Sequence, residues 1–218
     1  MDVLVAGVAG VAGMVAGATA GSRQHLLYRD AEMRKNPAAG RRALAIRLGL
    51  AGVCALIVAL AFRPDHYELF PAALTAVFCI VLAVAASTDF ERRRIPNRLT
   101  YPAFIAALAV SWAWPDRGVT DILIGLAFGT GLGVVFFAFG LLAKGGIGFG
   151  LGDVKLMMLI GALVGWPAAM PGLFLGVMLA GLPAVVLLAM GRRKAHFAYG
   201  PYLAAAGVVV LLFPANFG

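Results

Sequence analysis

Two aspartates, Asp89 and Asp153, are the residues of this sequence whose type and position point most directly to chemistry. Asp89 ends one long apolar segment, and Asp153 begins another. Ionisable side chains at such positions are costly in a membrane and are commonly functional. Two carboxyl groups that lie close together share a proton, because they cannot easily both ionise. The ionised member can then take a proton from water as that water attacks a carbonyl, which the protonated member polarises.

Each aspartate also has a structural interpretation. Asp89 precedes the basic run Arg92–Arg94, with which it could pair. Asp153 stands where a helix would begin, and a carboxylate at a helix N-terminus is stabilised by the helix dipole. Taken singly, the two positions do not decide between a catalytic and a structural role, so the flanking motifs matter.

A glycine-rich stretch, K-G-G-I-G-F-G-L-G-D, leads from Lys144 to Asp153. Its glycine density predicts a flexible loop that can adopt positive φ and lets another backbone approach closely. A phosphate-binding loop is the obvious alternative, but the G-x-x-x-x-G-K-[ST] spacing is absent. A flexible loop beside an acid in a membrane suits a site that must admit an extended peptide.

The elements that must position these residues are membrane-spanning helices. Of the 218 residues, 62% are hydrophobic and 13% are charged, and the mean hydropathy is +0.93. A soluble domain could not cover its surface with so few charges. The apolar runs are continuous and lack the alternation of barrel strands, so the sequence predicts an all-α polytopic transmembrane helical bundle.

Eight apolar segments are expected to cross the bilayer, and seven crossings are the main alternative. The second, fourth and sixth segments are short for a hydrocarbon core of roughly 30 Å. The first has an acidic start, so we expect it to remain as a span and not to be cleaved as a signal peptide. The approximate ranges of the eight segments are 3–20, 48–62, 70–88, 100–114, 121–142, 154–167, 172–190 and 202–216.

Basic residues indicate how the chain is oriented. Of the 18 Lys and Arg residues, all but Arg63 and Arg117 fall on one side of the expected spans. This bias predicts that side to be cytoplasmic, with both termini on the other side. The longest polar stretch, 23–47, is expected to be a short basic cytoplasmic loop within a single integral membrane domain covering 1–218.

Other residue types argue against nucleic acid, metals and cofactors as binding partners. The net charge of +8 is explained by this topology and by anionic lipids, and there is no basic domain on which nucleic acid could dock. Cys54 and Cys79 lie inside apolar segments and the three histidines are scattered, so neither a metal nor a cofactor is expected. The tryptophans fall beside the expected outer loops, as in an interfacial aromatic belt: Trp112, Trp114 and Trp166.

The motifs around the two aspartates resemble those of the type IV prepilin peptidases, a branch of the G-x-G-D membrane aspartyl proteases. The first motif is Asp89 followed by the I-P-N turn Ile95–Asn97. The second is G-L-G-D-V-K at Gly150–Lys155, which leads into an apolar segment. Near the C-terminus, G-P-Y-L at Gly200–Leu203 is similar to the family's G-P-[FY]-L segment. The stretch from Gly21-Ser22 to Tyr28-Arg29 is weakly similar to the family's first cytoplasmic segment.

The resemblance implies that Asp89 and Asp153 are the catalytic carboxylates of a peptidase in the cytoplasmic (inner) membrane. Such an enzyme cleaves the basic leader of pilin-like precursors at the cytoplasmic boundary, so its partners would be a prepilin-like substrate and the lipid bilayer. Lys155 would either extend to the lipid head groups or bias the charge of Asp153. The residues expected to support the site are Gly150, Gly152, Lys155, Pro96 and Asn97, of which the last two would form a turn.

The sequence departs from the larger bifunctional members of that family, which carry paired C-x-x-C motifs after the first span. Only a short polar stretch occurs there and it has no such cysteines, which leaves N-methylation of the cleaved product in doubt. Acidic residues near the basic face are the candidates for recognising a basic leader: Asp30, Glu32 and Glu91.

The main alternative function is a proton-coupled membrane transporter in which Asp89 and Asp153 relay protons. Both aspartates lie near one face and no convincing internal repeat is evident, which favours the peptidase. A presenilin-like protease is another alternative, but this sequence does not have the Y-D and P-A-L elements of that class in corresponding places. A non-catalytic assembly factor would not require both acids.

Overall fold

The structure, a computed structural model, describes residues 3–29, 34, 40–63, 67–142, 149–190 and 198–217. Over these ranges the regular secondary structure is entirely helical, which confirms the predicted all-α class. Short 3-10 helices cover Gln24–Leu27 (η1), Ser111–Ala113 (η2) and Pro214–Asn216 (η3). The eight α-helices of the described residues are α1 (Val3–Arg23), α3 (Arg41–Ala61), α4 (Leu69–Arg92), α5 (Asn97–Ala109), α6 (Val119–Leu142), α7 (Leu151–Val164), α8 (Ala169–Ala189) and α9 (Gly200–Leu212).

Several of these helices have the length and composition of membrane spans, and the chain is a multi-pass membrane protein. Among the described residues, four segments are long and apolar enough to cross a bilayer: Val5–Leu27, Ala43–Ala61, Leu69–Arg92 and Val119–Leu142. Two shorter apolar helical segments are Ala169–Pro183 and Gly200–Leu212. Eight helices agree with the eight expected segments, whereas the number that crosses the membrane stays a prediction.

α3 begins earlier than the sequence predicts. The expected span began at residue 48, whereas α3 starts at Arg41, so part of the expected 23–47 loop is helical. Arg, Leu and Ala are favourable helix formers, and arginine side chains can extend from an apolar helix toward water. The prediction that the second span is short is therefore wrong. The fourth and sixth, α5 with 13 residues and α7 with 14, are short as predicted.

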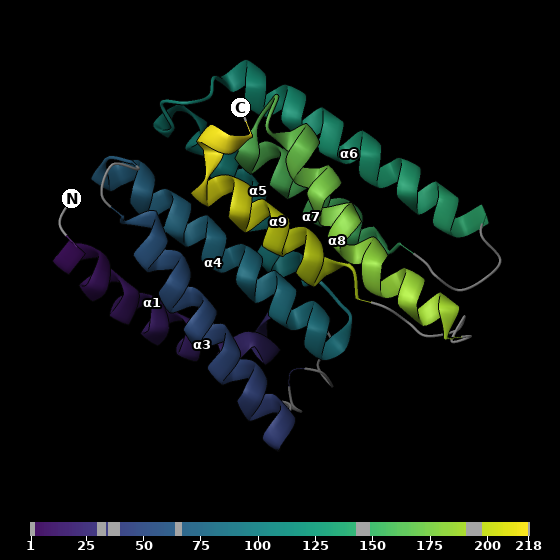
Figure 1. The fold of residues 1–218 in the computed structure, drawn as a ribbon, viewed down its shortest axis with the longest axis horizontal. Helices are drawn as coiled ribbons and strands as arrows, with labels where there is room; N and C mark the ends of the chain where they lie inside the picture. Colours follow the sequence, from purple (N-terminus) through teal and green to yellow (C-terminus); the bar gives the residue numbers. More distant parts are fainter. Residues whose placement is uncertain are drawn as a thin grey trace. The chain divides into compact units, whose positions relative to one another are not determined.

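The helices form two compact units, residues 1–103 and residues 104–218, which are described separately. In the first unit, α1 lies beside α3, and α4 packs against α3 (Figure 1). The pair α1 and α3 is antiparallel, because Gly10 faces Ala59 whereas Gly21 faces Arg47. Glycines along α1 let the two backbones approach closely, as small residues do between membrane helices.

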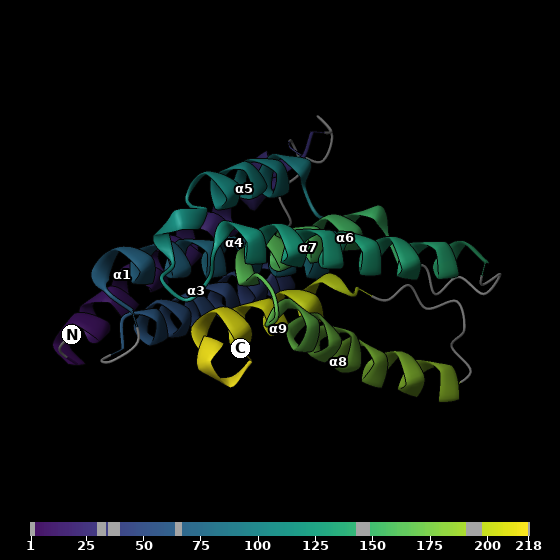
Figure 2. The same cartoon turned by 90° about the horizontal axis from the view of Figure 1, so that it is seen from above.

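In the second unit, α7 is packed between neighbours. Figure 2 shows α6 running alongside α7, and both α8 and α9 also contact α7. Five large side chains of α7 are no more than 1% exposed: Leu156, Met157, Leu159, Ile160 and Leu163. α6 approaches through Gly125, Gly129 and Gly133, which are spaced four residues apart and therefore share one face. This packing fixes α7 and hence its first turn, where Asp153 lies.

Candidate active site

Asp153 lies in the first turn of α7, and the residue is 8% exposed. Its Oδ2 accepts a hydrogen bond of 2.9 Å from the backbone N–H of Gly150, the residue that precedes the helix. The N–H of Asp153 donates in turn to the carbonyl of Gly150 at 3.0 Å. The carboxylate therefore caps its own helix, as its structural interpretation expected, and this contact fixes the direction of the side chain.

Tyr199 lies near Asp153, although the two are far apart in the sequence. It immediately precedes α9, and its ring centroid is 5.4 Å from that of Phe149. Burial and, secondly, the negative charge of Asp153 raise the pKa of the Tyr199 phenol. The G-x-G-D motif and the G-P-Y-L segment therefore meet within the second unit. Tyr199 was not among the residues predicted from the sequence, and its position directly before G-P-Y-L was the available signal.

Asp89 lies in the last turn of α4, because the helix continues to Arg92 and does not end at residue 88 as expected. The residue is 6% exposed. Its carbonyl accepts a hydrogen bond of 2.7 Å from the N–H of Arg93, which has a left-handed backbone with φ 54°. A left-handed residue at this position ends a helix. Asp89 is thus held at a helix C-terminus, whereas Asp153 is held at a helix N-terminus.

Gln24, which follows α1, forms hydrogen bonds with the helical turn that carries Asp89. It is 5% exposed, and its Oε1 accepts a hydrogen bond of 2.9 Å from the hydroxyl of Ser87. Its Nε2 donates to the carboxylate of Glu91. Ser87 and Glu91 are one helical turn apart and flank Asp89 in the sequence. One amide side chain therefore ties both sides of this turn to the segment after α1.

Tyr28 makes a second link between the same two segments. Its hydroxyl donates to the carbonyl of Thr88 at 3.4 Å, and the guanidinium carbon of Arg92 lies 5.2 Å from its ring centroid. Burial, aided by the negative charge of Glu91 and opposed by Arg92, raises the pKa of Tyr28 to about 12. The phenol is therefore a neutral donor at neutral pH. The weak family similarity at Tyr28-Arg29 was the sequence signal for this contact.

The I-P-N motif forms the turn between α4 and α5, as predicted. Pro96 is buried, and its carbonyl accepts hydrogen bonds from the N–H groups of Leu99 at 3.0 Å and Thr100 at 3.2 Å. Asn97 is the first residue of α5. Pro96 and Asn97 thus shape the backbone that follows the turn of Asp89, and their contribution to catalysis stays a prediction.

The glycines near Asp153 do not have the conformation expected of a glycine-rich loop. Gly150 is extended, with φ −87° and ψ 158°, and Gly152 lies in the first turn of α7, so neither needs positive φ. A Cβ at position 150 would lie 3.4 Å from Oδ2 of Asp153, so glycine leaves room for the carboxylate. Lys155 is half-buried on α7. Residues 143–148 of this stretch lie outside the described residues.

The acids expected to recognise a basic leader are only partly described. Asp30 and Glu32 lie outside the described residues. Oε1 of Glu91 lies 3.2 Å from Nε of Arg92, and its Oε2 accepts from Gln24. These contacts partly offset its negative charge and give Glu91 a role in fixing the end of α4.

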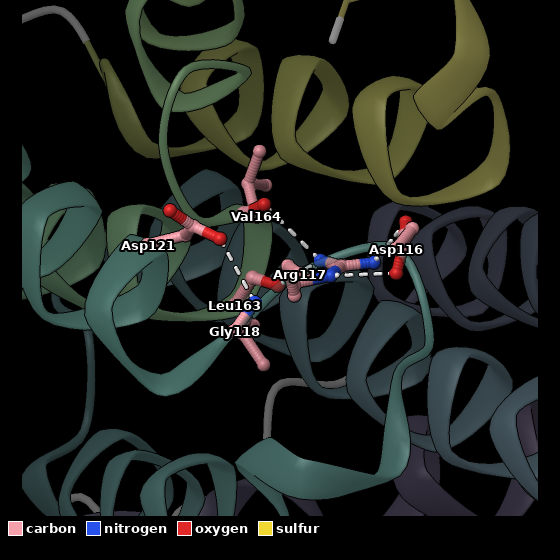
Figure 3. A network of polar contacts seen from close by, with 6 residues as sticks. All are labelled: Asp116, Arg117, Gly118, Asp121, Leu163 and Val164. Carbon is pink, nitrogen blue, oxygen red and sulfur yellow. Dashed lines mark hydrogen bonds and ion pairs between the residues drawn. The ribbon is translucent and has the colours of Figure 1, made fainter.

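Arg117 closes the opposite end of α7 (Figure 3). The residue is 8% exposed, and its Nη1 donates to the carbonyl of Leu163 and, at 3.2 Å, to that of Val164. Its Nη2 forms an ion pair of 3.1 Å with Asp116. A cation at a helix C-terminus satisfies otherwise free carbonyls and stabilises the helix dipole. α7 is thus capped at one end by Asp153 and at the other by Arg117.

Asp121 reproduces the geometry of Asp153 on a different helix. It lies in the first turn of α6, and its Oδ2 accepts a hydrogen bond of 2.8 Å from the N–H of Gly118 (Figure 3). The spacing of three residues is the same as between Gly150 and Asp153. Asp121 therefore provides an internal comparison for a carboxylate that caps a helix.

The predicted aromatic belt is only partly consistent with the structure. Trp112 and Trp166 are 71% and 36% exposed. Trp114 is 2% exposed, and its ring lies 5.1 Å from the guanidinium carbon of Arg117. The prediction is wrong for Trp114, which is a buried residue whose ring packs against the buried guanidinium of Arg117.

A comparison with known protein families identifies what these motifs belong to. The sequence profile of the type IV leader peptidase family matches residues 76–186, about half of the chain. The chain belongs to the type IV leader peptidase family. The matched range contains Asp89 and Asp153, and it also contains Pro96, Asn97 and Lys155. The described residues hold no group of three or more His, Cys, Asp or Glu side chains that could bind a metal ion.

Type IV leader peptidase relatives with curated names include three proteins named prepilin leader peptidase/N-methyltransferase. The protein from Burkholderia pseudomallei (strain 1026b) is 34% identical over 152 residues, which cover 67% of this chain and 48% of the relative. The proteins from Dickeya chrysanthemi and Aeromonas hydrophila are 31% and 30% identical, with 75% of this chain and 57% and 56% of the relatives covered. The chain thus spans about half the length of the curated relatives it matches. No solved structure matches it.

Proposed function

We propose that this chain is a membrane aspartic endopeptidase that cleaves the basic leader of pilin-like precursors at the cytoplasmic boundary of the membrane. The observation that carries the proposal is that the family match spans two buried carboxylates, Asp89 and Asp153, each at the end of a helix. Burial of an acid in an apolar protein is costly, so buried acids of this kind commonly have a function. The relatives are named as prepilin leader peptidases, and this name supplies the class of substrate.

The two helix ends suggest different roles for the two acids. The N-terminus of α7 and the N–H of Gly150 favour the ionised carboxylate of Asp153, so we assign to it the removal of a proton from water. The C-terminus of α4 carries the negative end of a helix dipole, which disfavours the ionised form of Asp89. Asp89 would then be the protonated member, which polarises the peptide carbonyl and later helps to protonate the leaving amine.

We propose cleavage alone as the reaction of this chain. The 218 residues contain two cysteines, Cys54 and Cys79, both fully buried, and no C-x-x-C pair. The paired motifs that accompany methyltransferase activity in larger family members therefore have no counterpart in this sequence. The substrate of the proposed reaction is a precursor with a basic leader followed by a hydrophobic segment.

The test is cleavage of a pilin-like precursor in membranes that contain the wild-type chain or a variant. Asp89→Ala and Asp153→Ala should each lower the rate of cleavage by about 100-fold or more, because each removes one of two groups that transfer protons. Leader release is measured by the change in mobility of the precursor on a gel. The amount of membrane-inserted protein is measured in the same samples.

Asp121→Ala is the matched control. It removes the side-chain oxygen that caps α6 with the geometry of Asp153, and so it reports what the loss of a cap alone does to cleavage. We expect this variant to cleave at nearly the wild-type rate. Normal cleavage by both Asp89→Ala and Asp153→Ala would exclude the mechanism, and equal losses for Asp121→Ala and Asp153→Ala would show that Asp153 has only a structural role.

A further inference from the structure

A cleft of about 790 Å³ opens in the first unit, and neither Asp89 nor Asp153 lines it. One wall is the segment that follows α1, with Tyr28 and Arg29. The other wall is the turn after α4 and the start of α5, which contribute Arg94, Pro96 and Arg98 among others. All of its lining residues belong to residues 27–102, so the cleft is formed within one unit.

The charge of this cleft is positive. Arg29, Arg94 and Arg98 line it, and all three are exposed. None of the described residues that line it is acidic. Arginine binds phosphate through paired N–H groups, whereas a cationic peptide would be repelled. The cleft therefore suits a phosphate-bearing anion and not the basic leader of the proposed substrate.

The depth of the cleft indicates where that anion comes from. One wall begins at Leu27, where a candidate membrane span ends, and the other begins at Arg94, two residues after the span that ends at Arg92. The ends of apolar spans lie at the level of the lipid head groups. Leu27, Ile95 and Pro96 add apolar surface beside the arginines. Cations next to apolar surface at this depth match a phospholipid, which presents a phosphate above its acyl chains.

We propose that this cleft binds the head group of an anionic phospholipid, with its phosphate between Arg94 and Arg98. The lipid would then hold the segment after α1 against the turn that connects α4 and α5. This inference does not depend on the proposed peptidase activity, because it concerns binding and can be tested in the absence of a precursor.

The test uses the full chain in a neutral detergent and titrates short-chain phosphatidylglycerol, with bound lipid counted by native mass spectrometry. We expect saturable binding, which the double variant Arg94→Gln/Arg98→Gln weakens about tenfold. The matched control is Arg23→Gln/Arg41→Gln. It removes the same charge from exposed positions in the same unit that do not line the cleft, and it should bind like the wild type.

Two further ligands distinguish the source of the phosphate. Short-chain phosphatidylcholine should bind at least several-fold more weakly, because its choline carries a compensating positive charge. Inorganic phosphate should not compete at equal concentration. Competition by inorganic phosphate, or equal weakening by the two double variants, would overturn the proposal. If Arg94→Gln/Arg98→Gln does not fold, Arg98→Gln alone is judged by the same criteria.

Discussion

At the scale of single residues, Asp153 and Tyr199 offer a contact that can be measured directly. Tyr199 lies outside α9, and its pKa is raised first by burial and second by the charge of Asp153. We expect Asp153→Asn to lower the pKa of Tyr199, because the negative charge that opposes the phenolate is removed. The pKa should remain above its ordinary value, because the larger cause, burial, is unchanged.

The measurement is a spectrophotometric titration of tyrosinate in detergent, with Tyr199→Phe in each background to isolate the signal of this residue. For this titration Asp121→Asn is the matched control, since Asp121 does not contribute to the pKa shift of Tyr199. If Asp153→Asn leaves the titration curve of Tyr199 the same as in the wild type, the two groups do not interact.

At the scale of elements, the position of Asp153 depends on how closely α6 packs on α7. A Cβ at Gly161 would collide with the carbonyl oxygen of Gly125 on α6. We expect Gly161→Ala to lower the free energy of unfolding by about 1–3 kcal/mol, because the colliding atom is backbone and cannot rotate away. Reversible unfolding in mixed detergent and SDS micelles measures the change.

Gly131→Ala is the control for this packing prediction. Gly131 is also on α6, but a Cβ there would meet nothing within 4 Å. Alanine should leave stability unchanged or raise it slightly, because alanine favours helix more than glycine does. Equal losses for Gly131→Ala and Gly161→Ala would contradict a specific close approach of α6 and α7.

At the scale of the whole molecule, the distribution of basic residues predicts the orientation in the membrane. Arg41, at the start of α3, is expected on the cytoplasmic side, and Trp112, after α5, on the opposite side. Both are exposed, so each can be replaced by cysteine. In right-side-out membrane vesicles, an impermeant maleimide should label Trp112→Cys directly and Arg41→Cys only after permeabilisation.

The native cysteines do not interfere with this labelling experiment, because Cys54 and Cys79 are 0% exposed. The unsubstituted chain therefore provides the background. The reverse pattern would show that the basic face is not cytoplasmic. Labelling of both positions before permeabilisation would show that they lie on the same side of the membrane, so that an even number of crossings separates them.

Local sequence information was enough to predict the class of the protein, the helical fold and the two aspartates at helix ends. It consists of the length of apolar runs, the low share of charged residues and short motifs around Asp89 and Asp153. Hydrophobic content adds up along the chain, so it can be read without knowing which segments are neighbours. Helix ends were predicted less accurately, and both the start of α3 and the end of α4 differ from expectation.

The distant residues that support the aspartates could be found only from the packing of the folded chain. Tyr199 lies near Asp153, and Gln24 fastens the turn of Asp89, although neither contact joins neighbouring parts of the sequence. The same holds for Trp114, which the structure buries beside Arg117. Such contacts depend on how closely helices approach, which the glycines of α1 and α6 set through backbone packing. A one-dimensional pattern of apolar residues does not contain that information.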